Sequence, residues 1–477
     1  MKAGVPPIWY RLHEESEVCA REDGVVVASP LYRVTIAPLS PPQRAVMLRL
    51  AQTACSVRSI NQALELAHEE NRLTTFYRYL SCLLRHRMAV IGTGEQGEGR
   101  TLATLLPISP LFRHLWVTIV PQRCYRLSRF AYIRREDDGY CYLESPLAHA
   151  RLRLEQAQAA SLVCLLGRAI TAGELARAAP VEDGEQVMGL LILLVMGNFV
   201  SLTTPEGQPV MECDAAARHW DFHDLVFHSC SRGGRHDNEL GGTYRFVSQF
   251  PPQPAVKQAA WPVALRLFRP DLQRLRREDP GLTTVLEERT SMRAYGEQPM
   301  TVRQLGEFLY RVARVRELED RGETGEYSRR PYPGAGASYE LELYLTVAHC
   351  EGLAPGFYWY NPQEHTLSLV HPPAHGTRQL LTDAAQAMGS TARPQVLITL
   401  AARFQRVSWK YQGLAYALIL KDVGVLYATM YLVATAMNLA PCALGAGDSD
   451  LFTQLCGAEY LAETSVGEFM LGSRPAS

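Results

Sequence analysis

Residues 288–293 read Glu288-Arg289-Thr290-Ser291-Met292-Arg293, and this stretch is the first of four motifs in the C-terminal half of the chain. In an extended segment alternate side chains point the same way, so Arg289, Ser291 and Arg293 line one face. Two guanidiniums and a hydroxyl on one face suit the oxygens of a phosphate group. Because the chain is rich in arginine, an ordinary solvated face remains an alternative for this motif taken alone.

Three further motifs follow. The second motif has small residues after two prolines. Small residues let a backbone approach a flat ligand closely, although a Gly-x-Gly of this kind is often only a turn. The third comes after an apolar stretch, and the fourth is a strand that ends the chain on an arginine. They read Arg330-Pro331-Tyr332-Pro333-Gly334-Ala335-Gly336-Ala337-Ser338, Leu444-Gly445-Ala446-Gly447 and Phe469-Met470-Leu471-Gly472-Ser473-Arg474-Pro475.

The segments between the motifs alternate in predicted structure. Residues 341–345 and 396–400 look like strands, and residues 423–437 form an apolar or small-residue run long enough for a buried central helix. The pattern predicts a mixed domain of helices and strands over residues 281–477.

Together the four motifs resemble the nitroreductase-like flavoprotein superfamily and, within it, the SagB-type dehydrogenases that oxidise azolines in ribosomal peptide pathways. The resemblance covers about Phe227 to Pro475, and the motifs fall in the family's order and spacing. It is closest to the thiazoline oxidases of cyanobactin pathways, through Asp422-Val423-Gly424, Tyr431-Leu432-Val433-Ala434-Thr435-Ala436-Met437 and Ala440-Pro441-Cys442-Ala443-Leu444-Gly445. The resemblance implies an FMN cofactor and a homodimer that builds its flavin site across the subunit interface.

The resemblance also implies roles for individual residues. Arg289, Arg293 and Arg474 would hold the FMN phosphate and the N1/C2 carbonyl edge, and Ser291 would add a hydrogen bond. The backbone of Leu444-Gly445-Ala446 would lie near N5 of the flavin ring. The segment Pro333-Gly334-Ala335-Gly336 would pack on the ring from the other subunit. The chain departs from the family by having Gly334 in place of a frequent serine and Tyr339-Glu340 in place of His-Pro.

Lys410-Tyr411 matches a Lys-Tyr pair that SagB-type enzymes place beside the substrate. Aromatising an azoline removes a proton from one ring carbon and a hydride from its neighbour, and FMN accepts only the hydride. A desolvated lysine with a lowered pKa, or a tyrosine hydrogen-bonded to it, would take the proton. The chain contains only four lysines, which favours a catalytic role for this one over a solvated loop lysine. Which of Lys410 and Tyr411 is the base stays open.

The N-terminal half contains a diverged duplication. Arg11-Leu12, Arg21-Glu22-Asp23-Gly24 and Ser29-Pro30-Leu31 reappear as Arg126-Leu127, Arg135-Glu136-Asp137-Asp138-Gly139 and Ser145-Pro146-Leu147, and the last pair is offset by 116 residues (145 − 29). Each copy predicts short strands, three helices and a returning strand, which is the order of a winged helix. The predicted fold class is therefore α+β, with two winged-helix-like domains (1–115 and 116–215), a linker and dimer-arm segment (216–280) and the FMN domain (281–477).

Three roles are open for the winged helices. DNA binding by a basic third helix fits the first copy, which has Arg78, Arg85 and Arg87, but the third helix of the second copy, within 187–196, has no basic residue. The favoured role is recognition of the precursor peptide as an added strand. The third alternative is a purely structural brace for the dimer.

The bulk composition fits this reading. The chain has 477 residues, 47% hydrophobic content and a net charge of −1, which predicts several globular domains and gives no reason to expect nucleic acid or a membrane as partner. The N-terminus has no apolar signal region, and the 11 cysteines form no C-x-x-C, so we expect a cytoplasmic protein with reduced thiols. His223, His228, Cys230 and His236 have no standard zinc spacing, and no metal is expected.

The leading hypothesis is an FMN-dependent oxidase of thiazolines or oxazolines in a heterocyclised peptide made by a ribosome, with O2 as the final electron acceptor. A generic NAD(P)H-dependent flavin reductase of nitro compounds or quinones is the close alternative. A non-enzymatic DNA-binding regulator is the distant one.

Overall fold

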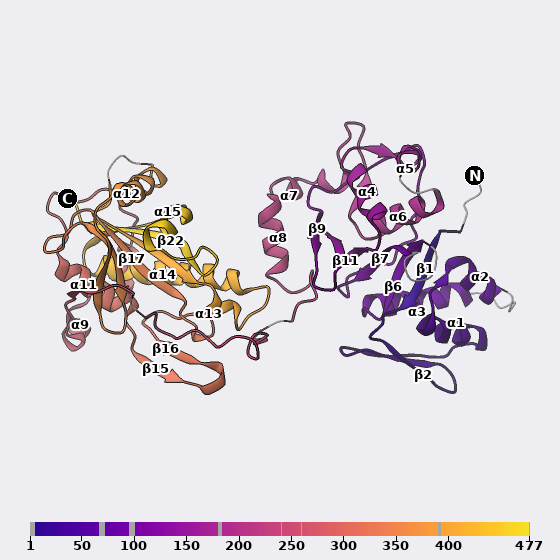
Figure 1. The fold of residues 1–477 in the computed structure, drawn as a ribbon, viewed down its shortest axis with the longest axis horizontal. Coiled ribbons are helices and arrows are strands. Elements are labelled where there is room, and N and C mark those ends of the chain that lie inside the picture. Colours follow the sequence, from indigo (N-terminus) through magenta and orange to yellow (C-terminus); the bar gives the residue numbers. More distant parts are fainter. Residues whose placement is uncertain are drawn as a thin grey trace. The chain divides into compact units, whose positions relative to one another are not determined.

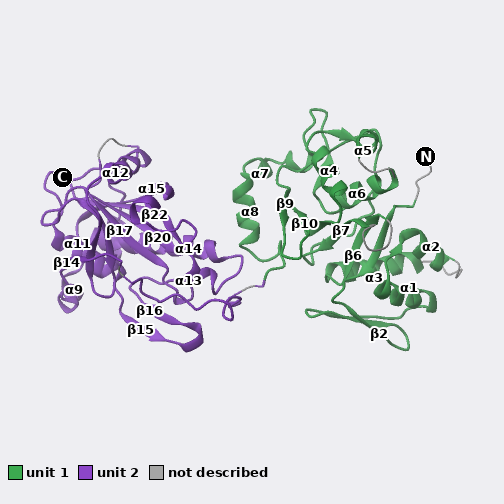
Figure 2. Ribbon diagram, in the orientation of Figure 1, with its two compact units in different colours: residues 1–238 green, residues 239–477 purple. Residues whose placement is uncertain are grey.

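The computed structural model describes residues 5–65, 72–94, 101–179, 184–239, 241–258, 260–389 and 393–476. The chain forms two compact units, residues 1–238 and 239–477, which are described separately (Figure 2). The finer division at residues 115, 215 and 280 stays a prediction.

The duplication in the first unit is visible in its strand pairing. β1 (Ile8–Leu12) pairs with β5 (Cys55–Ser56) and β6 (Ala89–Gly94), and β8 pairs in the same way with β12 and β13. β8 begins 116 residues after β1 (124 − 8). The second set of strands is β8 (Cys124–Leu127), β12 (Ile170–Thr171) and β13 (Val200–Leu202).

Three helices accompany each set of strands (Figure 1). They are α1 (Pro41–Gln52), α2 (Val57–Glu65) and α3 (Arg72–Arg85), then α4 (Ala157–Leu165), α5 (Ala172–Ala178) and α6 (Gly184–Met196). Two of them begin at residues with capping side chains. Ser40 is the N-cap of α1, and Thr171 caps α5 reciprocally with Glu174, whose backbone N–H donates to Thr171 Oγ1 at 3.2 Å.

The two repeats differ in how their hairpin strands pair. β2 (Glu17–Ala20), β3 (Val25–Ala28) and β4 (Arg33–Ile36) form a three-stranded sheet of their own. Their counterparts are β9 (Tyr132–Arg135), β10 (Cys141–Glu144) and β11 (Ala150–Leu154). In the second repeat β11 pairs on its other side with β7 (Thr101–Pro107), and through β7 and β6 the sheet continues into the first repeat. One buried cluster runs from Ile8 to Val200, so the repeats share a core as well as a sheet.

The predicted linker contains ordered elements. The short η1 (Val210–Glu212), α7 (Ala215–Arg218) and α8 (Phe222–Cys230) belong to the first unit, where Arg129 donates to the carbonyl of Trp220 at 3.0 Å. β14 (Val263–Arg266) and α9 (Leu272–Glu278) belong to the second unit. In the described ranges, no three His, Cys, Asp or Glu side chains lie close enough together to hold a metal ion.

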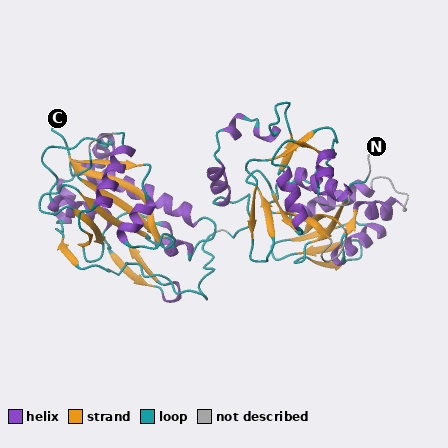
Figure 3. Cartoon of the chain, turned by 45° about the horizontal axis from the view of Figure 1, so that its top comes forward, coloured by secondary structure: helices purple, strands orange, loops and turns teal. Residues whose placement is uncertain are grey.

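The second unit is built on a seven-stranded antiparallel sheet with helices packed on it (Figure 3). Its strands, in spatial order, are β14, β19 (Thr366–His371), β18 (Gly356–Asn361), β17 (Leu341–Val347), β20 (Val396–Arg403), β22 (Glu463–Ser473) and β21 (Leu439–Leu444). A separate hairpin joins β15 (Glu317–Asp320) to β16 (Glu326–Arg329). The remaining elements are α10 (Leu282–Glu288), α11 (Val302–Ala313), the short η2 (Gly322–Thr324) and η3 (Ala335–Ala337), α12 (His375–Ala387), α13 (Gln405–Ser408), α14 (Ala415–Ala436) and α15 (Ser449–Cys456).

Helices cover both faces of this sheet. Alternate residues of a strand point to opposite faces, so Leu343 and Leu345 pack with buried residues of α11 and α14, whereas Tyr344 packs against Phe452 of α15. Every residue of β17 is buried for this reason. The one charged residue of β17, Glu342, pairs with Arg403 of β20 at 2.9 Å.

α14 is the central helix of the second unit. It begins eight residues before the predicted start, because the charged pair Lys421 and Asp422 interrupts the apolar run of the sequence. In the described part of the chain it is the one helix long and apolar enough to cross a membrane by composition, but its buried face packs on α11 and the sheet as a core helix does. It ends before Asn438, whose φ of +53° is a conformation that asparagine tolerates.

Candidate active site

Tyr431 of α14 joins the first predicted motif to β21. Arg289 directly follows α10, and its guanidinium carbon lies 5.3 Å from the centre of the Tyr431 ring. Ser291 Oγ lies 2.8 Å from the Tyr431 hydroxyl, which also accepts a hydrogen bond from the backbone N–H of Ala443 at 2.8 Å. The motif is thereby fixed beside the strand that leads to Leu444.

The other two predicted arginines lie along the same edge. The N–H of Met292 donates to the carbonyl of Pro441 at 2.8 Å, so the next residue, Arg293, lies close to β21. Arg474 directly follows β22 and donates from Nη1 to Asn438 Oδ1 at 2.9 Å. Among the described residues, no carboxylate forms an ion pair with Arg289, Arg293 or Arg474. Uncompensated guanidiniums on one edge favour an anionic ligand.

The segment Leu444-Gly445-Ala446 lies further along α14. β21 runs back along this helix, and Leu444 is paired with Glu468 of β22. Burial, and to a smaller extent the nearby Glu468, raises the pKa of Tyr427, and burial raises the pKa of Glu468 itself. Gly445 and Ala446 are exposed, so a ligand can reach their backbone.

The loop of the second motif contacts the other end of α14. The backbone N–H of Ala335 donates to Asp422 Oδ2 at 2.8 Å, and the carbonyl of Gly336 accepts from Lys410 Nζ at 3.3 Å. Gly336 has a φ of +56°, and a Cβ there would overlap the Tyr411 hydroxyl. Only glycine fits at this position. The structure therefore brings the loop Pro333–Gly336 together with the predicted catalytic pair.

The predicted site residues consequently form two groups, which lie beside the two ends of one stretch of α14. Asp422 and Tyr431 are nine residues apart, which is about 13 Å along a helix axis. The arginine edge lies at the Tyr431 end, the loop with Lys410 and Tyr411 lies at the Asp422 end, and Leu444-Gly445-Ala446 lies between them.

Lys410 lies among three tyrosine rings. Its Nζ is 5.3, 5.4 and 5.6 Å from the ring centres of Tyr327, Tyr411 and Tyr244. Burial by itself lowers the pKa of Lys410, but the facing phenols outweigh burial and the net pKa lies above its ordinary value. The lowered lysine pKa considered from the sequence is wrong, because the sequence did not reveal Tyr244 and Tyr327 as neighbours.

A buried acid pair supports the loop. Burial raises the pKa of Glu340 to about 8, and the nearby charge of Asp422 adds to the shift. Glu340 is fully buried, and burial also raises the pKa of the nearby Asp422. The sequence gave one signal of this pair, an aspartate within an apolar helix.

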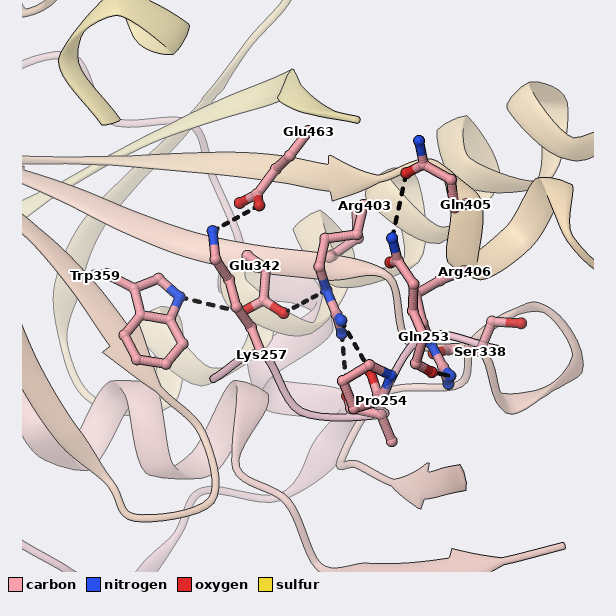
Figure 4. A network of polar contacts seen from close by, with 12 residues as sticks. Gln253, Pro254, Lys257, Ser338, Glu342, Trp359, Arg403, Gln405, Arg406 and Glu463 are labelled. Atoms are coloured by element: carbon pink, nitrogen blue, oxygen red, sulfur yellow. Dashed lines mark hydrogen bonds and ion pairs between the residues drawn. The ribbon is translucent and has the colours of Figure 1, made fainter. Parts of the chain in front are cut away.

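Two buried arginines tie the surrounding segments together (Figure 4). Arg406 donates to the carbonyls of Ser338 at 2.7 Å and Glu326 at 3.1 Å, and so fixes the end of the loop and strand β16. Arg403 donates to the carbonyl of Pro254 at 2.8 Å and pairs with Glu342 at 2.9 Å. Sequence reasoning missed both arginines, since nothing distinguishes them from the exposed arginines of the chain.

Comparison with known proteins identifies the domain that carries this site. The nitroreductase family model matches residues 286–473. A protein of Methanocaldococcus jannaschii that is described as a nitroreductase is 30% identical over 177 residues, which are 37% of this chain and 82% of that protein. The chain belongs to the nitroreductase family. Proteins of this family are oxidoreductases that typically bind a flavin.

A second family model matches outside the nitroreductase domain. The Cyanobactin oxidase ThcOx model matches residues 125–237, which contain the second repeat and helices α7 and α8. With the nitroreductase match, it confirms the resemblance to the cyanobactin-pathway oxidases and SagB-type azoline dehydrogenases. The sequence motifs that indicate this likeness lie between about Phe227 and Pro475, so most of the second match lies before them.

Solved structures give weaker similarities. A nitroreductase structure from Ralstonia eutropha covers 48% of this chain and 100% of its own, with 19% identity and a TM-score of 0.35. The E. coli microcin synthetase McbBCD complex has 17% identity over 49% of this chain and 88% of its own, with a TM-score of 0.33. An FMN complex of a nitroreductase from Desulfovibrio desulfuricans has 11% identity over 42% of this chain and 88% of its own, with a TM-score of 0.29.

Proposed function

We propose that this chain is an FMN-dependent azoline dehydrogenase, which oxidises thiazolines or oxazolines of a heterocyclised precursor peptide to thiazoles or oxazoles. The observation that carries the proposal is the arrangement on α14, where an unpaired arginine edge and a Lys-Tyr pair flank one exposed backbone segment. Membership of the nitroreductase family and the match to the cyanobactin oxidase model support it.

The residues present fit an FMN molecule, which has a phosphate at one end and a planar ring at the other. Arg289, Arg293 and Arg474 would hold the phosphate and the N1/C2 edge, with Ser291 as a further hydrogen-bonding group. The backbone of Leu444-Gly445-Ala446 would lie near N5, and Pro333-Gly334-Ala335-Gly336 would pack on the ring. The bound flavin supplies the acceptor for the hydride.

The protein supplies the acceptor for the proton. Breaking the C–H bond on one ring carbon delivers a proton to the Lys410-Tyr411 end of the site, and the electron pair forms the new ring double bond as the neighbouring carbon loses its hydride. A positioned base makes such a step faster by roughly 100-fold or more. Lys410 Nζ is held beside the loop by the carbonyl of Gly336.

The first unit would recognise the precursor peptide through its winged-helix-like repeats. DNA binding is disfavoured in the second repeat, because α6 has no basic residue and eight of its side chains are buried. A peptide can instead add a strand to an open sheet edge. In the described chain β4 is paired only with β3, whereas its counterpart β11 is already paired with β7. We therefore place the added strand on β4.

A homodimer would complete the site. α10 and α14 pack together and expose Leu282 (68%), Leu286 (52%) and Leu420 (38%) on the single chain. A second copy of the same surface would bury these side chains and bring a second loop Pro333–Gly336 toward the flavin. The cytoplasmic location, the absence of a membrane or nucleic-acid partner and O2 as the final acceptor remain predictions.

The test is oxidation of a heterocyclised precursor peptide by the purified full-length protein with FMN, in air and without nicotinamide, followed by mass spectrometry. We expect the loss of two hydrogens for each azoline. Family membership keeps the generic nitro or quinone reductase as the second candidate, and reduction of such compounds with NADPH but no change in the peptide would favour it. A protein that binds no flavin and does bind DNA would favour the regulator.

The proposed docking of the peptide on β4 can be tested separately. Hydrogen exchange of the full-length chain, with and without the precursor peptide, should show new protection of the backbone amides of β4 and none at β11. Protection at β9 or β5 without protection at β4 would contradict this placement.

A further inference from the structure

The environment of Lys410 points to a second tyrosine pair that the Lys-Tyr motif does not include. Tyr244 and Tyr327 come from two different segments, the chain after the first unit and strand β16, and their rings lie 5.6 and 5.3 Å from Lys410 Nζ. The backbone N–H of Tyr244 donates to the carbonyl of Lys410 at 3.2 Å, and Gly242 forms an isolated bridge with Tyr411. The cluster is thus held by backbone contacts as well as by its rings.

This inference rests on the proposed function. We propose that Tyr327 is the proton acceptor of the oxidation and receives the proton by way of Tyr244. Lys410 stays protonated and stabilises the Tyr327 phenolate. Tyr244 is partly exposed, whereas Tyr327 is 7% exposed. Tyr244 would take the substrate proton at its oxygen while it passes its own hydroxyl proton to Tyr327.

The charges around the pair fit this assignment. Burial by itself raises the pKa of Tyr327, but the nearby polar groups of Tyr244, Thr324 and Lys410 and the charge of Lys410 outweigh burial and lower it. The neighbouring Tyr327 hydroxyl and burial raise the pKa of Tyr244. Of these two phenols, Tyr327 therefore ionises first and Tyr244 stays protonated.

Two cations on neighbouring segments act in the same sense, while Glu326, next to Tyr327 in the chain, acts against them. From the β15–β16 hairpin, the Arg321 guanidinium lies 4.3 Å from the centre of the Tyr327 ring, although its pairing with Glu319 reduces its effect. From α13, the buried Arg406 adds a second positive charge near Tyr327. Positive charge stabilises a phenolate and disfavours a neutral lysine, so the surroundings suit a tyrosine base better than a lysine base.

A route for the proton to leave is also present. A cavity of about 20 Å³ lies beside the cluster, lined by Tyr327, Trp409 and Lys410 together with Pro252, Glu326 and Arg406. This volume has room for about one water molecule. The Tyr327 proton can pass to that water after each turnover, which returns the cluster to its starting charge.

Replacement of Lys410 by arginine or glutamine separates a cation from a base. Arginine keeps the positive charge and cannot act as a base. With flavin-loaded full-length protein and an azoline peptide, we expect Lys410→Arg to stay within about tenfold of the parent rate and Lys410→Gln to lose about 100-fold. Tyr327→Phe should lose about 100-fold at pH 7, and part of this loss should be regained at alkaline pH, where Tyr244 ionises. Tyr460→Phe, at an exposed tyrosine, is the matched control.

Ultraviolet titration of tyrosinate gives a readout that needs no turnover. The tyrosine that ionises earliest in the parent should be absent in Tyr327→Phe and should ionise at higher pH in Lys410→Gln. Equal inactivity of the arginine and glutamine variants, with Tyr327→Phe at the parent rate and an unchanged titration, would overturn the proposal. If the parent binds FMN but leaves azolines unchanged, the proposed function fails, and the titration still decides the charge assignment of the cluster.

Discussion

The two ends of α14 hold their groups in opposite ways. At the Tyr431 end, Arg289 and Arg293 are exposed and have no carboxylate partner in the described chain. At the Asp422 end, the polar groups are partly or fully buried, and they contact one another: Glu340 faces Asp422, and Lys410 faces three tyrosines.

This difference indicates that one end of the site binds the cofactor and the other end transfers the proton. Exposed, unpaired cations are suited to binding an anion from solution, because no internal partner has to be displaced. Buried, mutually facing groups have shifted pKa values, which suit proton transfer at a fixed position. Substitutions at the first end should therefore affect cofactor affinity, and substitutions at the second should affect turnover, its pH dependence or local stability.

The largest effect is expected at the arginine end. Arg289→Ala combined with Arg293→Ala removes two charge-assisted contacts to the phosphate and should weaken FMN binding by at least about 100-fold. Flavin fluorescence quenching measures this affinity. Arg277→Ala, at an exposed arginine of α9, is the control and should bind FMN like the parent. Parent-like affinity of the double variant would remove these arginines from the cofactor site.

Lys410→Ala should show the reverse behaviour. We expect FMN affinity within about threefold of the parent and azoline turnover lower by about 100-fold, because the cation beside the proton acceptor is lost. Flavin titration and a peptide oxidation assay on the same preparation test both parts. Lys421→Ala, at an exposed lysine of α14, is the matched control. If Lys410→Ala lost FMN as well as activity, the two ends of the site would not have separate functions.

A smaller effect is expected from Gly336→Ala. The added methyl group meets the Tyr411 hydroxyl at a backbone conformation that costs a non-glycine residue roughly 1 to 3 kcal/mol. Turnover should fall by about tenfold as the loop moves away from Lys410. Gly424→Ala, where a Cβ meets nothing within 4 Å, should instead raise the unfolding free energy by about 0.5 to 1 kcal/mol. Thermal unfolding and turnover of the two variants give the comparison, and equal behaviour would contradict it.

A pH dependence of stability is expected from Glu340. Its pKa rises from 4.5 to about 8 in the folded chain, so between these values the folded state holds a proton that the unfolded state has lost. This group therefore lowers the stability of the folded chain as the pH rises through that window, by up to about 1.4 kcal/mol per unit, and has no further effect above it.

Glu340→Gln removes this dependence. Its unfolding free energy relative to the parent should increase from pH 5 to pH 8, as measured by denaturant unfolding in the same buffers. Glu364→Gln, at an exposed carboxyl, should leave the parent's pH profile unchanged. A parallel profile for parent and Glu340→Gln would show that the pKa of Glu340 is not raised in the folded chain.

The local elements were largely predictable from sequence, because they depend on local signals. The capping box at Thr171, the strand at 341–345 and the apolar helix that became α14 all follow from residue type and spacing. The contact of Lys410 with the loop Pro333–Gly336 is consistent with placing both motifs at one site.

What could not be predicted depends on long-range contacts. The pairing of β11 with β7 joins the two repeats into one sheet, and no feature of either strand alone specifies its partner. Likewise, Tyr244 and Tyr327 reach Lys410 from segments 166 and 83 residues away in sequence (410 − 244 and 410 − 327), and so the direction of its pKa shift became apparent only in the folded chain.

The central claim is that azoline oxidation delivers a hydride to a flavin bound on this chain. Anaerobic mixing of the FMN-loaded protein with a thiazoline-containing peptide, without nicotinamide, tests it in a single turnover. The account predicts that the absorbance of oxidised flavin disappears as thiazole forms in equal amount, and that it returns on admission of air. Flavin that remains oxidised with the peptide but is reduced by NADPH would contradict the account.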